Sequence, residues 1–318
     1  RTQLAVGVSK PYTYILGGAF MDFLYTLQNL RNPVLDTIMS IITNLGGELI
    51  VIAALCIIYW CINKDFAYKL CFTYFISGLL VQGAKIACRV ERPWVRDSRL
   101  TCVESARKAA TGYSFPSGHT QGVTGLFSSI AFHIKKSWFY VVSLVIIAAV
   151  MFSRMYLGCH TPQDVITAFA ITIVTSAAVS LLYDRISSND KANVIVFILT
   201  EVISIALIIY SSYVVSSGKS TTELAMDGFK AAGAGIGFGI GWFLEKEFIH
   251  YDPRSVRTVW GQIIKVIAGL ATSLAFKQGL KLIGPDSVPV NIIRYIIVVI
   301  WVVAVFPFIV SKITSKEK

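Results

Sequence analysis

Long apolar segments recur along the chain, and they constrain its fold more than any other feature of the sequence. A membrane-crossing helix needs about 20 mostly apolar residues, and segments of this kind lie approximately at 45–62, 66–88, 118–134, 138–156, 162–183, 193–214, 225–243, 259–281 and 291–311. Only 15% of the residues are charged, against roughly 25% in soluble domains. So few charges could not cover a water-soluble enzyme of this size. The sequence therefore predicts an all-α fold, a polytopic membrane helix bundle with about nine transmembrane helices.

The segment before the first span is predicted to be an amphipathic helix that lies in the membrane interface. Within residues 12–32, the apolar side chains on one helical face are Leu16, Phe20, Phe23, Leu24 and Leu27. Residues 34–45 are expected to continue helically into the first span, with a kink at Gly46-Gly47. No basic stretch followed by an apolar stretch and a cleavage site opens the sequence, so no signal peptide is expected.

The seventh apolar segment carries small residues on one face, because Gly233, Gly237 and Gly241 are spaced four apart. Small residues at this spacing let two helices approach closely in lipid. We expect this face to pack within the same chain, and a homodimer seam stays the alternative.

The distribution of positive charge predicts how the chain lies in the membrane. There are 29 Lys and Arg residues against 18 Asp and Glu, but no basic tail or stripe, so nucleic acid is not expected as a partner. Cytoplasmic loops carry an excess of Lys and Arg. The loops expected to be cytoplasmic contain Lys64, Lys135, Lys136, Arg185, Lys191, Lys246, Arg254, Arg257, Lys312, Lys316 and Lys318. The Arg-rich loop 89–117 falls on the other side, so we expect its charges to serve a role other than topology.

Three polar clusters occur at span ends that the span count places on the same side of the membrane. They are Lys85-x6-Arg92-Pro93, Pro116-Ser117-Gly118-His119, and Ser153-Arg154-x5-His160-x3-Asp164. Ionisable groups at the edge of a bilayer bundle are costly, so they are candidates for function.

Together, these residue types describe a phosphate site. Lys85, Arg92 and Arg154 offer fixed positive charge, and arginine matches phosphate oxygens in a bidentate fashion. Ser117-Gly118-His119 opens a helix, whose free N–H groups can face an anion. One imidazole can attack phosphorus while the other protonates the leaving oxygen.

Each residue also has an ordinary structural interpretation. Asp164 and Ser117 are good helix N-terminal residues, Arg154 complements a helix dipole, and Lys85 can extend its ammonium to the membrane surface. These separate interpretations do not explain why all three clusters meet on one side with two histidines, His119 and His160.

The three clusters together resemble the signature of the type 2 phosphatidic acid phosphatase (PAP2) superfamily: K-x6-RP, then PSGH, then SR-x5-H-x3-D. They match it in order and without a departure over residues 85–164. The resemblance implies that His160 is the nucleophile and forms a phosphohistidine, that Asp164 orients it, and that His119 protonates the leaving group and then activates water. It also implies that the phosphoryl oxygens are bound by Lys85, Arg92, Ser117, Gly118 and Arg154. The family needs no metal, and we expect no metal ligands and no cofactor.

The family core usually has six spans, and the remaining residues are assigned around it. We expect an N-terminal interfacial helical segment at 1–44, a PAP2-like six-helix catalytic core at 45–214, and additional transmembrane helices at 215–318. A disulfide among Cys88, Cys102 and Cys159 is left open.

The predicted function is an integral membrane phosphatase that hydrolyses a lipid or isoprenoid phosphate or diphosphate without a metal, with membrane lipids around it. Its active site is expected on the extracytoplasmic or lumenal face. A phosphatase for a soluble ester such as a sugar phosphate is the alternative. An anion transporter or channel is less favoured, because the sequence shows neither helices broken at mid-membrane nor internal symmetry.

Overall fold

The structure is a computed structural model that describes residues 17–283 and 287–315, and these residues form helices without any β-strand. The helices of the first half are α1 (Gly17–Asn29), α2 (Pro33–Asn44), α3 (Glu48–Ile57), α4 (Lys64–Cys88), α5 (Pro93–Arg96), α6 (Glu104–Arg107), α7 (Gly118–Ile134) and α8 (Ser137–Tyr156). They are followed by α9 (Pro162–Ser187), α10 (Asp190–Ser216), α11 (Thr222–Leu244), α12 (Val259–Ile283), α13 (Val288–Ile300) and α14 (Phe306–Ser315). Short π-helical segments at Ile58–Ile62, Glu245–Ile249 and Trp301–Val305 extend α3, α11 and α13.

Seven helical stretches in the described part of the chain are long and apolar enough to cross a membrane. They are Pro33–Ile62, Lys64–Arg96, Ser137–Tyr156, Pro162–Ser187, Asp190–Ser216, Val259–Leu282 and Val288–Thr314. Many large apolar side chains on α8, α10 and α12 are exposed, as expected for helices that face lipid. The protein is therefore an all-helical, multi-pass integral membrane protein, as predicted.

The predicted count of nine spans is not confirmed. The two predicted spans outside the seven correspond to α7 and α11. Helix α7 has 17 residues, and its first turns contain His119, Thr120 and Gln121. Helix α11 begins with a charged half that contains Glu223 and Asp227. Both helices pack inside the bundle and contact other helices rather than lipid. Their sequences can therefore be less apolar than those of helices that face lipid.

The N-terminal helices differ in part from the prediction. Residues 12–16 lie outside the described residues. In α1, Leu24 and Leu27 are buried against Leu100 of the long loop, whereas Phe23 of the same predicted face is exposed. The loop thus covers a face that was expected to meet lipid. The chain does continue helically through α2, and the helix breaks between Asn44 and Glu48.

The break at Gly46-Gly47 positions the start of α7. A Cβ atom built on Gly46 would collide with the backbone carbonyl of His119, and one built on Gly122 would lie 2.9 Å from the carbonyl oxygen of Gly46. Two backbones approach this closely only because both positions lack a side chain. The PSGH segment is therefore held against the N-terminal helices by main-chain contact.

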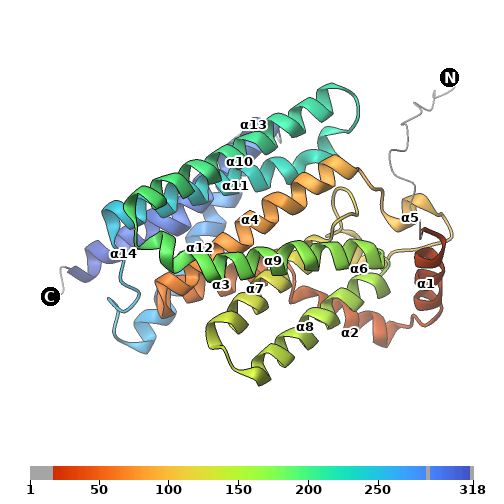
Figure 1. Ribbon diagram of the computed structural model, residues 1–318, viewed down its shortest axis with the longest axis horizontal. Coiled ribbons are helices and arrows are strands. Elements are labelled where there is room, and N and C mark those ends of the chain that lie inside the picture. The colour runs from red at the N-terminus through yellow and green to blue at the C-terminus, as the bar shows by residue number, and fades with distance from the viewer. Residues whose placement is uncertain (1–16, 284–286, 316–318) are drawn as a thin grey trace.

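Helices α4, α7, α8 and α9 form the bundle that carries the three polar clusters. The amide of Gln121 on α7 donates to the Tyr74 carbonyl (3.0 Å) and to the Ser77 hydroxyl (2.9 Å) of α4. The Ser128 hydroxyl of α7 donates to Ser176 of α9 at 2.8 Å. Because α4 and α8 end where α7 and α9 begin, all three clusters reach the same end of the bundle. Figure 1 shows α1, α5 and α6 gathered at that end, with α14 at the other.

The C-terminal helices pack on the bundle through small residues and aromatic rings. Cβ atoms built on Gly233 and Gly237 of α11 would each lie 2.6 Å from a backbone carbonyl of α13, that of Ile292 and that of Ile296. The small-residue face is thus an intramolecular seam, as expected. An aromatic core joins α4 to α11, where Phe72 lies 5.0 Å from Trp242 between ring centroids.

Replacing Gly237 with alanine is expected to destabilise the protein by about 1–3 kcal/mol, because the added methyl group overpacks the α11–α13 seam. A matched control is Gly279→Ala in α12, where an added Cβ meets nothing within 4 Å. Alanine favours the helix by up to about 1 kcal/mol over glycine, so this variant should be neutral or stabilised. Thermal unfolding of the purified proteins in detergent measures both effects, and equal shifts in the two variants would contradict the seam.

Candidate active site

The three polar clusters occupy adjoining helix ends. Lys85 lies in the last turn of α4, Arg92 is the residue before α5, and Arg154 lies in the last turn of α8. The backbone N–H of Ser117, just before α7, donates to the carbonyl of Asp164 in the first turn of α9 (3.1 Å). This bond joins the second cluster to the third. His119 and His160 therefore belong to the same end of the bundle.

Loop carbonyls hold the first two cationic side chains. The Lys85 ammonium donates to the carbonyl of Tyr113 at 2.9 Å. The Arg92 guanidinium donates to the carbonyls of Gly112 (3.2 Å), Thr111 (2.6 Å) and Cys159 (3.1 Å). Both side chains are buried. The segment 111–113 thus fixes the two cations next to the third cluster.

His160 is buried between a cation and a carboxylate. Its Nε2 lies 2.9 Å from Nη1 of Arg92, and its Nδ1 lies 3.4 Å from Oδ2 of Asp164, without the geometry of a hydrogen bond. Arginine can only donate, so the contact with Arg92 requires an unprotonated Nε2. The proton of the neutral ring then sits on Nδ1, on the side of Asp164.

The pKa of His160 lies well below its ordinary value. Burial is the main cause, and the positive charges of Arg92, Arg154 and Lys85 act in the same direction. The ring is therefore neutral at neutral pH, with a lone pair on Nε2.

Asp164 combines a structural role with its place beside His160. Its Oδ2 accepts hydrogen bonds from the Ser114 hydroxyl (2.6 Å) and from the backbone N–H of Thr161 (2.8 Å). The second bond is the helix-cap interaction that the sequence indicates. Its Oδ1 is buried and has no hydrogen-bond partner. Asp164 can therefore both cap the start of α9 and orient His160.

Arg154 is fully buried with most of its donors unused. Nη1 donates to the Thr43 hydroxyl of α2 at 3.1 Å, whereas Nε and Nη2 are buried without a hydrogen-bond partner. Leaving donors of a charged group unpaired in the interior is costly. An anion in the site would satisfy them.

The start of α7 offers room for such an anion. Ser117 caps the helix, with its hydroxyl accepting from Thr120, and a Cβ built on Gly118 would meet nothing within 4 Å. His119 follows, and its side chain is partly exposed. The start of α7 thus combines free N–H groups, the positive end of a helix dipole and open space beside Gly118, which together suit a phosphate.

Some contacts of the site carried no signal in the sequence. Ser114 is bonded to Asp164, and Thr43 is bonded to Arg154 across 111 positions of the chain. Of the three cysteines considered for a disulfide, Cys102 and Cys159 come together, with their sulfur atoms 3.5 Å apart and both thiols free. In the described part of the chain, no group of three or more His, Cys, Asp or Glu side chains is placed to hold a metal ion.

These features define a multi-pass helical membrane protein with a buried, strongly basic site at one end of the bundle. Two family models match the chain, the PAP2 superfamily over residues 66–188 and the PAP2 superfamily phosphatase transmembrane extension over residues 229–318. The chain belongs to the PAP2 superfamily, as its three motifs indicated.

Several curated proteins are similar to the chain. Sphingosine-1-phosphate phosphatase 2 of Mus musculus is 27% identical over 63% of this chain and 57% of its own length. A probable sphingosine-1-phosphate phosphatase of Dictyostelium discoideum is 29% identical over 50% of this chain and 41% of its own length. Phosphatidylglycerophosphatase B of Bacillus subtilis is 25% identical over 46% of this chain and 73% of its own length. The chain thus spans about half the length of the first two relatives.

A solved structure is also similar, that of a transmembrane PAP2-type phosphatidylglycerolphosphate phosphatase from Bacillus subtilis. It is 23% identical, with a TM-score of 0.46, over 55% of this chain and 89% of that chain.

Proposed function

We propose that this protein is a membrane phosphatase that hydrolyses a lipid or isoprenoid phosphate or diphosphate through a phosphohistidine, without a metal. The observation that carries the proposal is the convergence of His160, Arg92 and Arg154, with buried Arg154 donors that lack a partner. The names of the similar proteins, sphingosine-1-phosphate phosphatase and phosphatidylglycerophosphatase, support a phosphorylated lipid as the substrate class.

The proposed first step is the attack of His160 Nε2 on phosphorus. The Nε2 lone pair forms the N–P bond, the bond from phosphorus to the leaving oxygen breaks, and His119 gives that oxygen a proton. Burial and the three cations lower the pKa of His119 in the unliganded protein, so its ring would take up this proton together with the anionic substrate. Arg92 would move its Nη1 hydrogen bond from Nε2 to a phosphoryl oxygen, which frees the lone pair and stabilises the developing charge. Asp164 would stabilise the positive ring through Nδ1.

In the second step, water attacks the phosphohistidine and the N–P bond breaks. His119, now neutral, takes a proton from the water, and inorganic phosphate leaves. Lys85, Arg92, Arg154 and the N–H groups at Ser117 and Gly118 would bind the phosphoryl oxygens in both steps. Fixed positive charge would then serve the transition state, as metal ions do in other phosphoryl-transfer enzymes.

We further propose that this end of the bundle faces the extracytoplasmic or lumenal side. Lys64 and Lys135 lie at the opposite end of the bundle, as the distribution of basic residues in cytoplasmic loops requires. The same proposal divides the chain into segments 1–44, 45–214 and 215–318. It has nine transmembrane helices if α7 and α11 are counted.

A phosphate-release assay across substrate classes tests the function. Purified protein in detergent micelles is given sphingosine-1-phosphate, phosphatidic acid, phosphatidylglycerophosphate, undecaprenyl pyrophosphate and glucose-6-phosphate. We expect release from one or more of the lipids, inhibition by vanadate as a mimic of pentavalent phosphorus, and full activity in EDTA. Release from glucose-6-phosphate alone would contradict the lipid assignment, and EDTA inactivation that Mg²⁺ reverses would contradict the proposed chemistry.

A further inference from the structure

A polar cavity lies at the end of the bundle opposite the candidate active site. Its volume is about 280 Å³, and its walls come from α4, α7 and α9 and from Lys135, directly after α7. Thr73, in its wall, precedes Lys85 by twelve positions on α4, and at 1.5 Å per residue this places the two about 18 Å apart along the helix. The cavity is therefore separate from the site described above.

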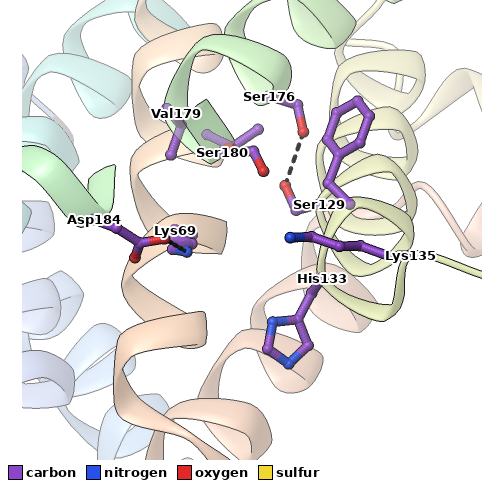
Figure 2. A pocket seen from close by; sticks show the side chains of 10 residues that line it. Lys69, Ser129, His133, Lys135, Ser176, Val179, Ser180 and Asp184 are labelled. Atoms are coloured by element: carbon purple, nitrogen blue, oxygen red, sulfur yellow. Dashed lines mark hydrogen bonds and ion pairs between the residues drawn. The ribbon is translucent and has the colours of Figure 1, made fainter. Parts of the chain in front are cut away.

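The cavity holds more positive than negative charge. Lys69 forms an ion pair with Asp184 at 2.8 Å, and the Asp184 side chain is 72% exposed to solvent. The Lys135 ammonium makes no hydrogen bond or ion pair with any residue that the structure describes. Figure 2 shows the Lys135 side chain directed into the space between His133 and Ser129. One ammonium is thus paired, and the other is available.

Hydroxyl groups form the inner wall of the same cavity. Ser129 and Ser176 face each other, with their oxygens 3.1 Å apart, as the dashed line in Figure 2 marks. The Thr73 side chain is 1% exposed, and its hydroxyl is buried without a hydrogen-bond partner. A buried hydroxyl normally has a partner. The buried Thr73 hydroxyl therefore lacks an acceptor, and the solvent-exposed Lys135 ammonium is available to the same ligand.

The available groups select an anion of modest size. The single carboxylate is already paired, so a cation would find no free negative charge. A tetrahedral phosphate offers several acceptor oxygens that can accept from an ammonium and hydroxyls together. Val179 and Phe132 add apolar wall, and the volume lies just below the range for drug-sized ligands.

We propose that this cavity is a second phosphate-binding site, at the end of the bundle opposite the candidate active site, which takes the phosphate of a phospholipid head group or free inorganic phosphate. Lys135 and Lys69 would supply the charge, and the Thr73 hydroxyl would donate the buried hydrogen bond. Asp184 would compete with the ligand for Lys69. The proposal does not depend on the chemistry at His160.

The experiment measures binding in the Arg154→Gln background, so that the candidate active site contributes little. Lipid-free protein in micelles is titrated with dioctanoyl phosphatidic acid, with inorganic phosphate, and with zwitterionic dioctanoyl phosphatidylcholine, and thermal unfolding reports the apparent Kd. We expect phosphatidic acid or phosphate to raise the unfolding temperature and phosphatidylcholine to leave it unchanged. Phosphatidic acid alone would identify a lipid head group, and equal binding of inorganic phosphate would identify the free ion.

Three further substitutions locate the site. Lys135 has a left-handed backbone, with φ of 56°, which asparagine tolerates, so Lys135→Asn removes the charge without new strain. We expect the Kd to rise about tenfold, because the ligand loses about one charge-assisted hydrogen bond. Lys136 is also exposed but does not line the cavity, so Lys136→Asn is the matched control and should retain the parent Kd.

Asp184→Asn gives an effect of opposite sign, because it releases Lys69 from its ion pair and should lower the Kd several-fold. Absent binding of both phosphate ligands, or equal Kd values in the Lys135→Asn and Lys136→Asn proteins, would overturn the proposal.

Discussion

Replacing His160 with alanine is expected to lower the rate of phosphate release by roughly 10⁴–10⁶-fold, because removing a catalytic nucleophile costs this much in comparable enzymes. Water would then have to attack phosphorus without the covalent intermediate. The fold should persist, since Arg92 keeps its bonds to the carbonyls of 111, 112 and 159 when the ring is removed. Phosphate release and thermal unfolding of the purified variant measure the two properties separately.

The control for this variant is His250→Asn. His250 lies in a loop at the other end of the bundle and has a left-handed backbone, with φ of 50°, which asparagine tolerates. It should retain activity within about twofold, as expected of a surface change. Turnover by His160→Ala equal to that of His250→Asn would remove the assignment of His160 as the nucleophile.

The role of His119 can be separated from that of His160 with the same assay. In His119→Ala, the leaving oxygen of a lipid phosphate lacks its proton donor, and the phosphohistidine lacks its base. An aryl phosphate has a good leaving group that needs no proton, so it should still phosphorylate His160. We expect phosphoprotein to accumulate with the aryl substrate in His119→Ala and to be absent in the double variant.

Arg154→Gln is expected to lower kcat/KM by about 10²–10³-fold, the usual effect of removing one preorganised donor to a transition state. Its effect on stability should have the opposite sign to that of an ordinary buried mutation. The unliganded protein buries a guanidinium with Nε and Nη2 unpaired, and removing an uncompensated buried charge relieves a cost. The unfolding temperature without ligand should therefore stay equal or rise.

Vanadate makes this test sharper. A ligand at 100 times its Kd stabilises the folded state by about 2.7 kcal/mol, so vanadate should raise the unfolding temperature of the unsubstituted protein much more than that of Arg154→Gln. Arg99→Gln is the matched control, because the Arg99 side chain is 76% exposed in the loop at the same end. A large fall in the stability of unliganded Arg154→Gln would show that Arg154 supports the fold instead.

Several helices could be predicted from local patterns. The segments 66–88 and 162–183 correspond closely to α4 (Lys64–Cys88) and α9 (Pro162–Ser187), because apolar composition and an N-terminal Thr-Pro pair mark them in the sequence. The glycine face of α11 could also be predicted, because close approach of two helices requires small residues at a fixed spacing. The residue that contacts this face, Ile296 of α13, could not be predicted, because the residue pattern of one helix does not show which helix packs against it.

Part of the candidate site could likewise be predicted from the sequence, and part of it could not. Its charged residues could be predicted, because ionisable groups in a membrane bundle are costly and rarely occur without a use. The residues that form hydrogen bonds with these charged side chains could not be predicted. Thr43 and Ser114 are common polar residues, and only the folded chain places one against Arg154 and the other against Asp164. The packing of α1 on Leu100 likewise replaced an expected contact with lipid.

By itself, the sequence determined that this chain is a helical membrane protein of the PAP2 superfamily, and it determined which side chains carry charge at one end of the bundle. Composition and spacing are local properties, and they survive in any arrangement of the helices. Only the tertiary structure decided which donors remain unpaired, which glycines meet a backbone, and which lysines line the polar cavity. These properties depend on contacts between residues distant in sequence, and such contacts exist only once the helices have packed.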